Sequence, residues 1–264
     1  MRHFSSPRIE FRSSSCYDII IENNPYILGR IKEQKMGTIT IQEQTTKDPI
    51  TLMGMESGIC YNSNTSDSEK NYKRGLECVK TNHGRVLEYP QVYLVIDGYS
   101  AKVIRELYTH IGGAPTRLQA STRYIDYEHG FDYVTPAKIS ASSEALEVYT
   151  NTIDTIKEAL LRLDGLGIPR EDSSMILPFC MTTKVVLRTN LRNLSDMSRQ
   201  RMCSRAWWEF RQLFGDIRNA LIDYSEEWKT LVTDASLNVF SPKCEVLGYC
   251  PEKNSCGRKP KKEI

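Results

Sequence analysis

The sequence predicts one large domain that mixes α-helices and β-strands, with appendages at its two ends. Two runs rich in β-branched and aromatic residues, Val92–Ile96 and Lys184–Arg188, have the composition of strands. Stretches at 67–82, 101–110 and 142–165 instead place apolar residues at helical spacing. A length of 264 residues, 40% of them hydrophobic and 26% charged, is enough to bury a sizeable core.

The N-terminal part predicts short strands followed by a helix. Residues 17–21 and 39–42 alternate in places between apolar and polar side chains, which is typical of strands. Ser66 and Glu69 have the spacing of a capping box, so we expect a helix over 67–82.

The middle of the chain predicts a strand, a turn, a helix and a long loop. Val92–Ile96 ends at Asp97-Gly98, which indicates a turn, and Ser100 is a suitable N-cap for a helix over 101–110. Gly112–Pro115 should end that helix. Residues 116–133 have few aliphatic side chains, so we expect a long loop that carries function.

The C-terminal half predicts three helices and a tail. Ser142 or Ser143 opens a helix that ends at Gly165, and its apolar stripe indicates a core helix. Asn190 is a good N-cap for the helix after the strand of Lys184–Arg188. A further helix is expected over 210–232, and short turns are expected from Ser241 onward.

Composition and hydropathy argue against a membrane or secreted protein and give no support for a nucleic-acid partner. The net charge of +2 indicates no bulk electrostatic partner, so nothing here supports nucleic acid. No apolar run reaches the ~20 residues of a membrane helix, and the first residues lack a signal core, so we expect a cytoplasmic protein.

The cysteines predict free thiols. There are eight, and without a secretion signal a disulfide framework is not favoured. Cys244, Cys250 and Cys256 are spaced six residues apart, wider than the C-x-x-C pairs of zinc sites. We predict no metal ligand, with a zinc site completed by Cys203, Cys180 or a histidine as the alternative.

Two short motifs could bind anions. Ser121, Thr122 and Arg123 combine hydroxyls with a guanidinium, which suits a phosphate, although such a triplet is also common surface decoration. Asn190 and Arg192 stand at a predicted helix start, where free N–H groups and the helix dipole favour polar or anionic ligands; an ordinary N-cap is the alternative.

Taken together, these motifs resemble the flavin-dependent thymidylate synthases. The resemblance covers about residues 50–232 and is most specific over Thr183–Leu194, continuing to Arg201, Trp208 and Glu209. Upstream, Gln119–Tyr124 matches the nucleotide signature, and His83–Tyr89 resembles a segment that runs along the flavin, which makes 85–87 candidate cofactor contacts.

The chain also departs from the pattern of that family. Thr109 and Ile111 replace the arginines of an Arg-His-Arg signature and leave His110 alone. Arg117 could restore one positive charge, or it could be merely solvated. Gln119 stands where a glutamate is usual, and Ser174 where many members carry an arginine.

The resemblance implies two binding sites. One is a deoxyuridylate (dUMP) site with Arg201 as the catalytic residue, and the other is an FAD site. The dUMP residues are Arg117, Gln119, Ala120, Ser121, Thr122, Arg123 and Arg201; the FAD residues are Leu87, His110, Asn190, Leu191, Arg192 and Asp196.

The implied fold is α+β, a central antiparallel sheet flanked by helices, in a homotetramer. The implied reaction methylates dUMP to dTMP with methylene-tetrahydrofolate and NADPH. Two alternatives stay open: a flavin-dependent hydroxymethylase of a pyrimidine nucleotide, and a degenerate, non-catalytic protein that binds nucleic acid. We expect an N-terminal extension over 1–50, the synthase-like domain over 51–235, and a basic, cysteine-containing tail over 236–264, outside the resemblance and not required for flavin chemistry.

Overall fold

A computed structural model describes residues 37–127 and 129–262. By compactness these residues form a small unit, 135–154, and a large unit made of 37–134 and 155–262. The predicted strand at 17–21 lies outside the described residues. The predicted boundaries at residues 50 and 235 stay predictions.

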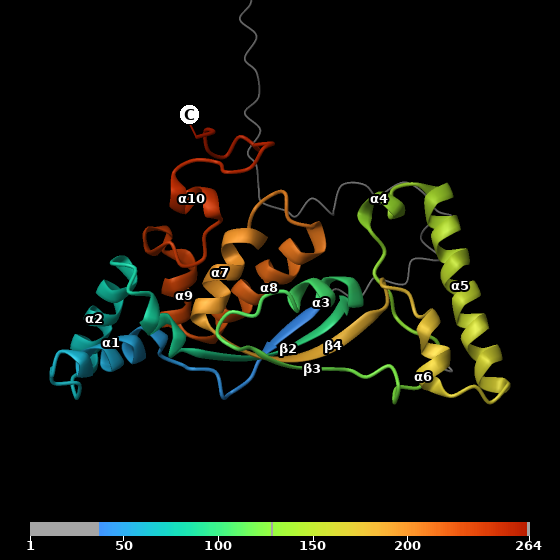
Figure 1. The fold of residues 1–264 in the computed structure, drawn as a ribbon, viewed down its shortest axis with the longest axis horizontal. Coiled ribbons are helices and arrows are strands. Elements are labelled where there is room, and N and C mark those ends of the chain that lie inside the picture. The colour runs from blue at the N-terminus through green and yellow to red at the C-terminus, as the bar shows by residue number, and fades with distance from the viewer. Residues whose placement is uncertain (1–36, 128, 263–264) are drawn as a thin grey trace, which may run out of the picture. The chain divides into compact units, whose positions relative to one another are not determined.

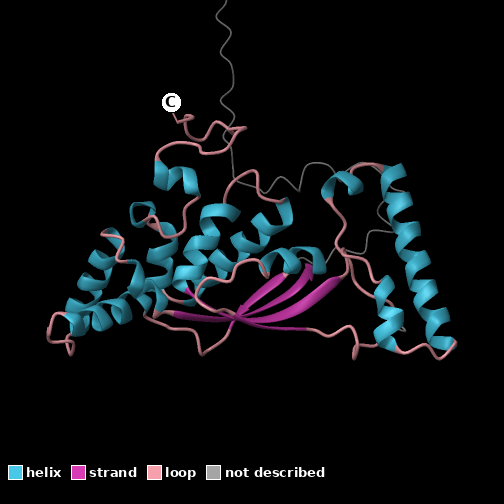
Figure 2. Ribbon diagram, viewed as in Figure 1, coloured by secondary structure: helices cyan, strands magenta, loops and turns pink. Residues whose placement is uncertain are grey.

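The large unit is built on a four-stranded antiparallel sheet (Figure 2). Its strands are β1 (Thr38–Ile41), β2 (Gln91–Ser100), β3 (Thr116–Gln119) and β4 (Thr182–Asn190), in the spatial order β1-β2-β4-β3. In the central pair, Leu94 lies opposite Leu187 and Ile96 opposite Val185, and all four side chains are buried. The strands predicted at 39–42, 92–96 and 184–188 are therefore confirmed.

Helices lie before, between and after these strands in the sequence. They are α1 (Pro49–Cys60), α2 (Ser68–Lys80), the 3-10 helix η1 (Gly84–Glu88), α3 (Ala101–Leu107), α4 (Ala137–Ser140), α5 (Ser143–Gly165), α6 (Arg170–Ser173), η2 (Ser174–Ile176), α7 (Leu191–Arg201), α8 (Trp208–Tyr224), α9 (Glu226–Thr233), η3 (Ala235–Leu237) and α10 (Lys243–Leu247). None of the helices in the described ranges is long and apolar enough to cross a bilayer.

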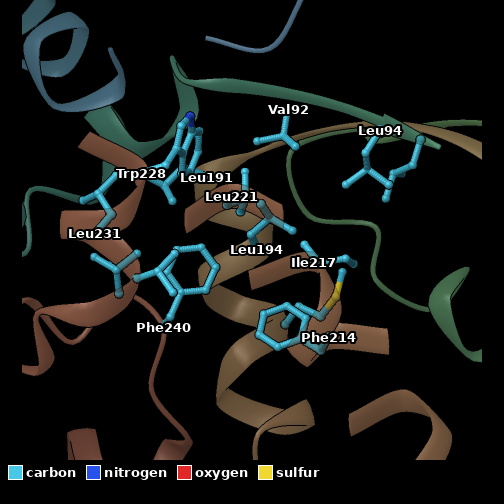
Figure 3. Packing of buried hydrophobic residues seen from close by; sticks show 14 of the residues in the cluster. Val92, Leu94, Leu191, Leu194, Phe214, Ile217, Leu221, Trp228, Leu231 and Phe240 are labelled. Atoms are coloured by element: carbon cyan, nitrogen blue, oxygen red, sulfur yellow. The ribbon is translucent and has the colours of Figure 1, made fainter. Parts of the chain in front are cut away.

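One face of the sheet is covered by helices, among them α7 and α8 (Figure 1). Side chains along β2 and β4 alternate between buried and more exposed positions, as expected for a sheet with one covered face. The core lies between that face and α7–α9, where Leu194, Phe214 and Trp228 are essentially inaccessible to solvent (Figure 3). The predicted α+β class with a central antiparallel sheet is confirmed.

Two predictions about the middle of the chain are wrong. Asp97-Gly98 is no turn, because β2 continues to Ser100 through a bulge at which Gly98 takes a φ of +78°. Residues 116–119 are no loop, because they pair with β4 as strand β3. In this strand only Arg117 is even half-buried, and the other three residues are exposed. Polar, exposed side chains suit a strand at the edge of a sheet.

Two predictions about the later helices also need correction. The helix expected over 210–232 is two helices, because Ser225 is extended and its hydroxyl caps α9 by accepting the Trp228 N–H. Helix α5 has the predicted bounds, but within the large unit it is not a core helix. Leu160 is buried outside the central cluster, and Ile156 and Leu163 are only half-buried.

Candidate functional site

A cluster centred on Arg201 joins the ends of α3 and α7. The Arg201 Nε–H donates to His110 Nε2 at 2.9 Å, and Nη1 donates to Glu106 Oε2 at 2.9 Å. The guanidinium lies over the Phe210 ring, 4.2 Å from its centroid, and the imidazole meets the same ring edge-on at 5.6 Å. Arg201 thus contacts His110, 91 positions earlier in the sequence, and Glu106, 95 positions earlier. The two predicted residues Arg201 and His110 are therefore brought together.

His110 is kept in its neutral form. Its side chain is 8% exposed, and burial lowers the pKa to about 4, with further lowering by the charges of Arg201 and Arg117. A neutral imidazole has one nitrogen that accepts, and here Nε2 accepts from Arg201. His110 therefore holds Arg201 and does not compete with it as a second cation.

Arg117 is bound to the end of α3. Its Nη2 donates to the carbonyl of His110 and, at 3.4 Å, to that of Leu107, and its guanidinium lies 5.0 Å from the centroid of the Tyr108 ring. Lone carbonyls at a helix C-terminus favour a cation. Arg117 is therefore not merely solvated, and its predicted part in the dUMP site stays a prediction.

An open groove of about 650 Å³ runs between η1 and α7. Arg192 and Asp196 lie one helical turn apart on α7, with Nε 3.6 Å from Oδ2, and Arg85 Nη1 lies 3.4 Å from Glu88 Oε2 across η1. The predicted residues Leu87, Arg192 and Asp196 all line it. Its lining residues are Asn82, Gly84, Arg85, Leu87, Glu88, Arg192, Ser195, Asp196, Arg199 and Val246.

The start of α7 is organised as expected. The Asn190 side chain caps it by accepting the Asn193 N–H at 2.9 Å. Gly113 packs against that amide so closely that a Cβ there would overlap it, and its φ of +69° also suits glycine. Leu191 is fully buried in the core, so its side chain cannot line a groove open to solvent.

The predicted phosphate loop lies at the end of β3. Gln119 Nε2 donates to Thr183 Oγ1 at 3.4 Å, and the Ala120 N–H donates to the Lys184 carbonyl at 2.8 Å, which anchor the loop to β4. Ser121 Oγ accepts the Arg123 N–H at 3.3 Å, and Thr122 is half-buried.

Arg123 is exposed on that loop and is held by α6. Its Nη2 lies 3.0 Å from Glu171 Oε2, and 61% of the Arg123 side chain is exposed. A neighbouring pair, Arg170 and Asp126 at 2.6 Å, ties the same loop to the same helix. These contacts of Arg123 and Arg170 do not reach Arg201 or the groove, whereas Arg117 of β3, just before the loop, contacts the His110 carbonyl of the Arg201 cluster.

Sequence reasoning missed Glu106, Phe210, Glu171, Arg199 and Val246. Glu106 stands four residues before His110, but its partner Arg201 is 95 residues away, so no local spacing could reveal the pair. Val246 belongs to α10, in the tail that was expected to play no part in flavin chemistry.

The cysteines of the described region carry free thiols. Burial raises the pKa of the Cys244 thiol, whereas a hydrogen bond with Ser204 lowers that of Cys256. Within 37–127 and 129–262, no three His, Cys, Asp or Glu side chains are placed to hold a metal ion.

The model of one protein family, described as "Thymidylate synthase complementing protein", matches residues 43–224. The chain belongs to the flavin-dependent thymidylate synthase family. A flavin-dependent thymidylate synthase of Geobacter sulfurreducens is 28% identical over 227 residues, covering 81% of this chain and 92% of the relative. That of Pyrococcus abyssi is 33% identical over 180 residues, covering 65% and 69%.

A solved structure supports the same fold. It is the UMP/dUMP methylase PolB from Streptomyces cacaoi bound with 5-Br dUMP, which superposes with a TM-score of 0.63 over 78% of this chain and 96% of that one, at 15% identity. The predicted family membership is thus confirmed, and with it an enzyme of the flavin-dependent thymidylate synthase family. The roles of individual residues in this member stay predictions.

Proposed function

We propose that this protein methylates dUMP to dTMP, with FAD as bound cofactor and methylene-tetrahydrofolate and NADPH as co-substrates. The observation that carries the proposal is the groove between η1 and α7. It brings together the two segments that resemble the flavin-contacting parts of the family, although they are about a hundred residues apart in sequence.

The groove residues fit FAD. About 650 Å³ lies within the range of cofactor sites, roughly 300–1,000 Å³. Arg85, Arg192 and Arg199 outnumber Glu88 and Asp196, so a diphosphate would meet a net positive lining. A Cβ on Gly84 would overlap the Arg192 guanidinium, so glycine lets η1 approach that side chain closely. When bound, the reduced flavin would supply the electrons that complete the methyl group.

The chain's own side chains would bind and orient the nucleotide. Arg201, held by His110 and Glu106, would face the base, and the exposed Arg123 with Ser121 would meet the phosphate. Ser121 is assigned to binding and not to nucleophilic attack, since no adjacent His or Lys would activate its hydroxyl. His110 would serve as an acceptor near neutral pH because its pKa is lowered to about 4.

The contacts of Arg123 do not reach Arg201 within one chain, which supports a site completed by another subunit. We therefore propose that the enzyme is a homotetramer, as the resemblance implies. We also propose that it acts in the cytoplasm.

A second product is favoured by one observation. Thr109 and Ile111 supply no charge where the family has arginines, and Ile111 is 74% exposed. A less cationic site could let water intercept the transferred carbon and yield a hydroxymethyl nucleotide. Product analysis after incubation with dUMP, methylene-tetrahydrofolate and NADPH separates the two outcomes, and a flavin-free, inactive protein would favour a non-catalytic role.

The decisive experiment is the flavin absorption spectrum of purified protein and of its Arg192→Ala variant. Losing a charge-assisted hydrogen bond costs roughly 1.5–3 kcal/mol, so FAD affinity should fall by about tenfold or more. Arg162→Ala, which removes an exposed arginine of α5, is the matched control and should retain flavin. Equal retention of FAD by both variants would contradict the assignment of the groove.

A further inference from the structure

The charge of Arg201 is already balanced within the chain. Glu106 contacts it at 2.9 Å, and the two side chains are only 16% and 32% exposed. The neighbouring His110 adds no charge, because its pKa is lowered to about 4. The net charge of Arg201 and the three side chains that contact it is therefore zero. These side chains are the carboxylate of Glu106, the neutral imidazole of His110 and the ring of Phe210.

We propose that Glu106 is a positioning and specificity residue of the nucleotide site, acting through Arg201. It fixes the guanidinium and cancels its charge, so that this part of the site receives an uncharged polar ring with carbonyl acceptors and rejects a phosphate. The inference rests on the proposed function and adds a residue to it that no motif of the sequence singles out.

The geometry fixes Arg201 from three sides. The bond from Nε orients one edge of the guanidinium, the bond from Nη1 orients another, and Phe210 supports its plane at 4.2 Å. These two bonds use two of the five N–H donors of a guanidinium. A donor fixed in this way loses less conformational entropy when it meets a ligand acceptor.

The other candidate cation contrasts with Arg201. Arg123 and Glu171 also form an ion pair, at 3.0 Å, but their side chains are 61% and 56% exposed. Exposed pairs are weak and screened by salt, so a dianionic phosphate could replace Glu171 beside Arg123. The half-buried Arg201–Glu106 pair is harder to replace. We therefore expect each ion pair to contact a different part of the nucleotide: Arg123 the phosphate and Arg201 the base.

The test is Glu106→Gln, which keeps an acceptor oxygen and removes the charge. Binding of dUMP and of deoxyuridine is measured by calorimetry at several salt concentrations. We expect deoxyuridine to bind about tenfold more weakly because Arg201 is less well held, whereas dUMP loses less because an unbalanced Arg201 now attracts its phosphate. For the same reason the affinity for dUMP should fall more steeply with salt than in the parent.

Two controls separate positioning from general stability. Glu252→Gln removes a carboxylate paired with Arg205, at 3.8 Å, and should bind both ligands like the parent. In an Arg201→Gln background, adding Glu106→Gln should change deoxyuridine binding no further, because Glu106 acts through Arg201. Glu106→Asp, which keeps the charge, should recover part of the parent's ligand preference.

The outcomes are distinct. If the parent binds nucleotide and Glu106→Gln leaves both affinities and the salt dependence unchanged, or lowers both affinities in equal proportion, the inference is overturned while the proposed function stands. If the double variant loses further deoxyuridine affinity beyond Arg201→Gln, Glu106 does not act through Arg201. A parent that binds neither ligand would overturn the proposed function and the inference together.

Discussion

His110 contacts two arginines, yet its imidazole is an acceptor for one and offers its backbone carbonyl to the other. Burial disfavours the charged imidazole, and both neighbouring guanidinium groups disfavour it further. The contact of His110 with Arg201 therefore depends on the lone pair of Nε2. Its pattern in the sequence indicated the residue but not its protonation state.

This neutral state predicts a pH dependence of stability. Between pH 6.5, the ordinary pKa, and about 4, the unfolded chain binds a proton at His110 that the native chain does not. The free energy of unfolding should therefore fall as the pH is lowered through that window. His110→Gln keeps an acceptor for Arg201 and removes the titration, so its stability should depend less on pH.

Urea unfolding at pH 5 and pH 7.5 measures the effect. Burial raises the pKa of Glu209, so the stability that this group contributes is lost as the pH rises, which is opposite to the effect of His110. Because parent and variant both contain Glu209, its effect cancels in the difference between their stabilities. The same pH dependence in parent and variant would show that His110 is not held neutral.

At the scale of elements, α7 is the part of the site that local signals describe best. Asn190 ends β4 and caps α7, and the predicted strand and helix meet at that residue as expected. The break between α8 and α9 was missed although Ser225 carries a usable signal. Its hydroxyl is a good N-cap, and two acidic residues follow in the first turn, one of which, Glu227, accepts the Ile50 and Thr51 N–H groups.

The pairing of α1 with α2 depends on two glycines. A Cβ on Gly54 would overlap the Asn71 carbonyl, and one on Gly75 would overlap the Ile50 carbonyl. Gly54→Ala should therefore lower the free energy of unfolding by about 1–3 kcal/mol through overpacking. Gly215→Ala in α8 is the matched control, because a Cβ there meets nothing within 4 Å, and it should raise stability by about 0.5–1 kcal/mol.

Chemical denaturation of both variants measures this contrast. If Gly54→Ala were as stable as Gly215→Ala, the close approach of the two helix backbones would be wrong.

At the scale of the molecule, the C-terminal tail lies against α7 and the segment that follows it. Ser195 Oγ donates to the Val239 carbonyl at 2.9 Å, and Arg258 Nη1 donates to the Met202 carbonyl at 3.4 Å. Val246 lines the candidate cofactor groove. The tail thus lies on the segment that ends in Arg201, although it lies outside the matched residues 43–224.

This arrangement changes the expected result of truncation. A chain ending at Ser241 keeps the buried residues Leu237, Val239 and Phe240, so it should still unfold cooperatively. It loses α10 and with it Val246, which is 44% exposed in the groove and would be covered by a bound cofactor, so FAD should bind more weakly, by roughly fivefold. A flavin titration measures it, with cooperative thermal unfolding as the control. Unchanged FAD affinity would restore the simpler expectation that the tail is not needed.

The sequence by itself determined the family, the fold class and those elements whose signals are local. These depend on local patterns, such as the caps at Asn190 and Ser100 or the β-branched run of β2, whose physical causes lie within a few residues. Only the tertiary structure decided which charges meet. The pairing of Arg201 with Glu106, the binding of Arg117 to the end of α3, and the burial of Leu191 depend on contacts between segments far apart in sequence, which no local spacing encodes.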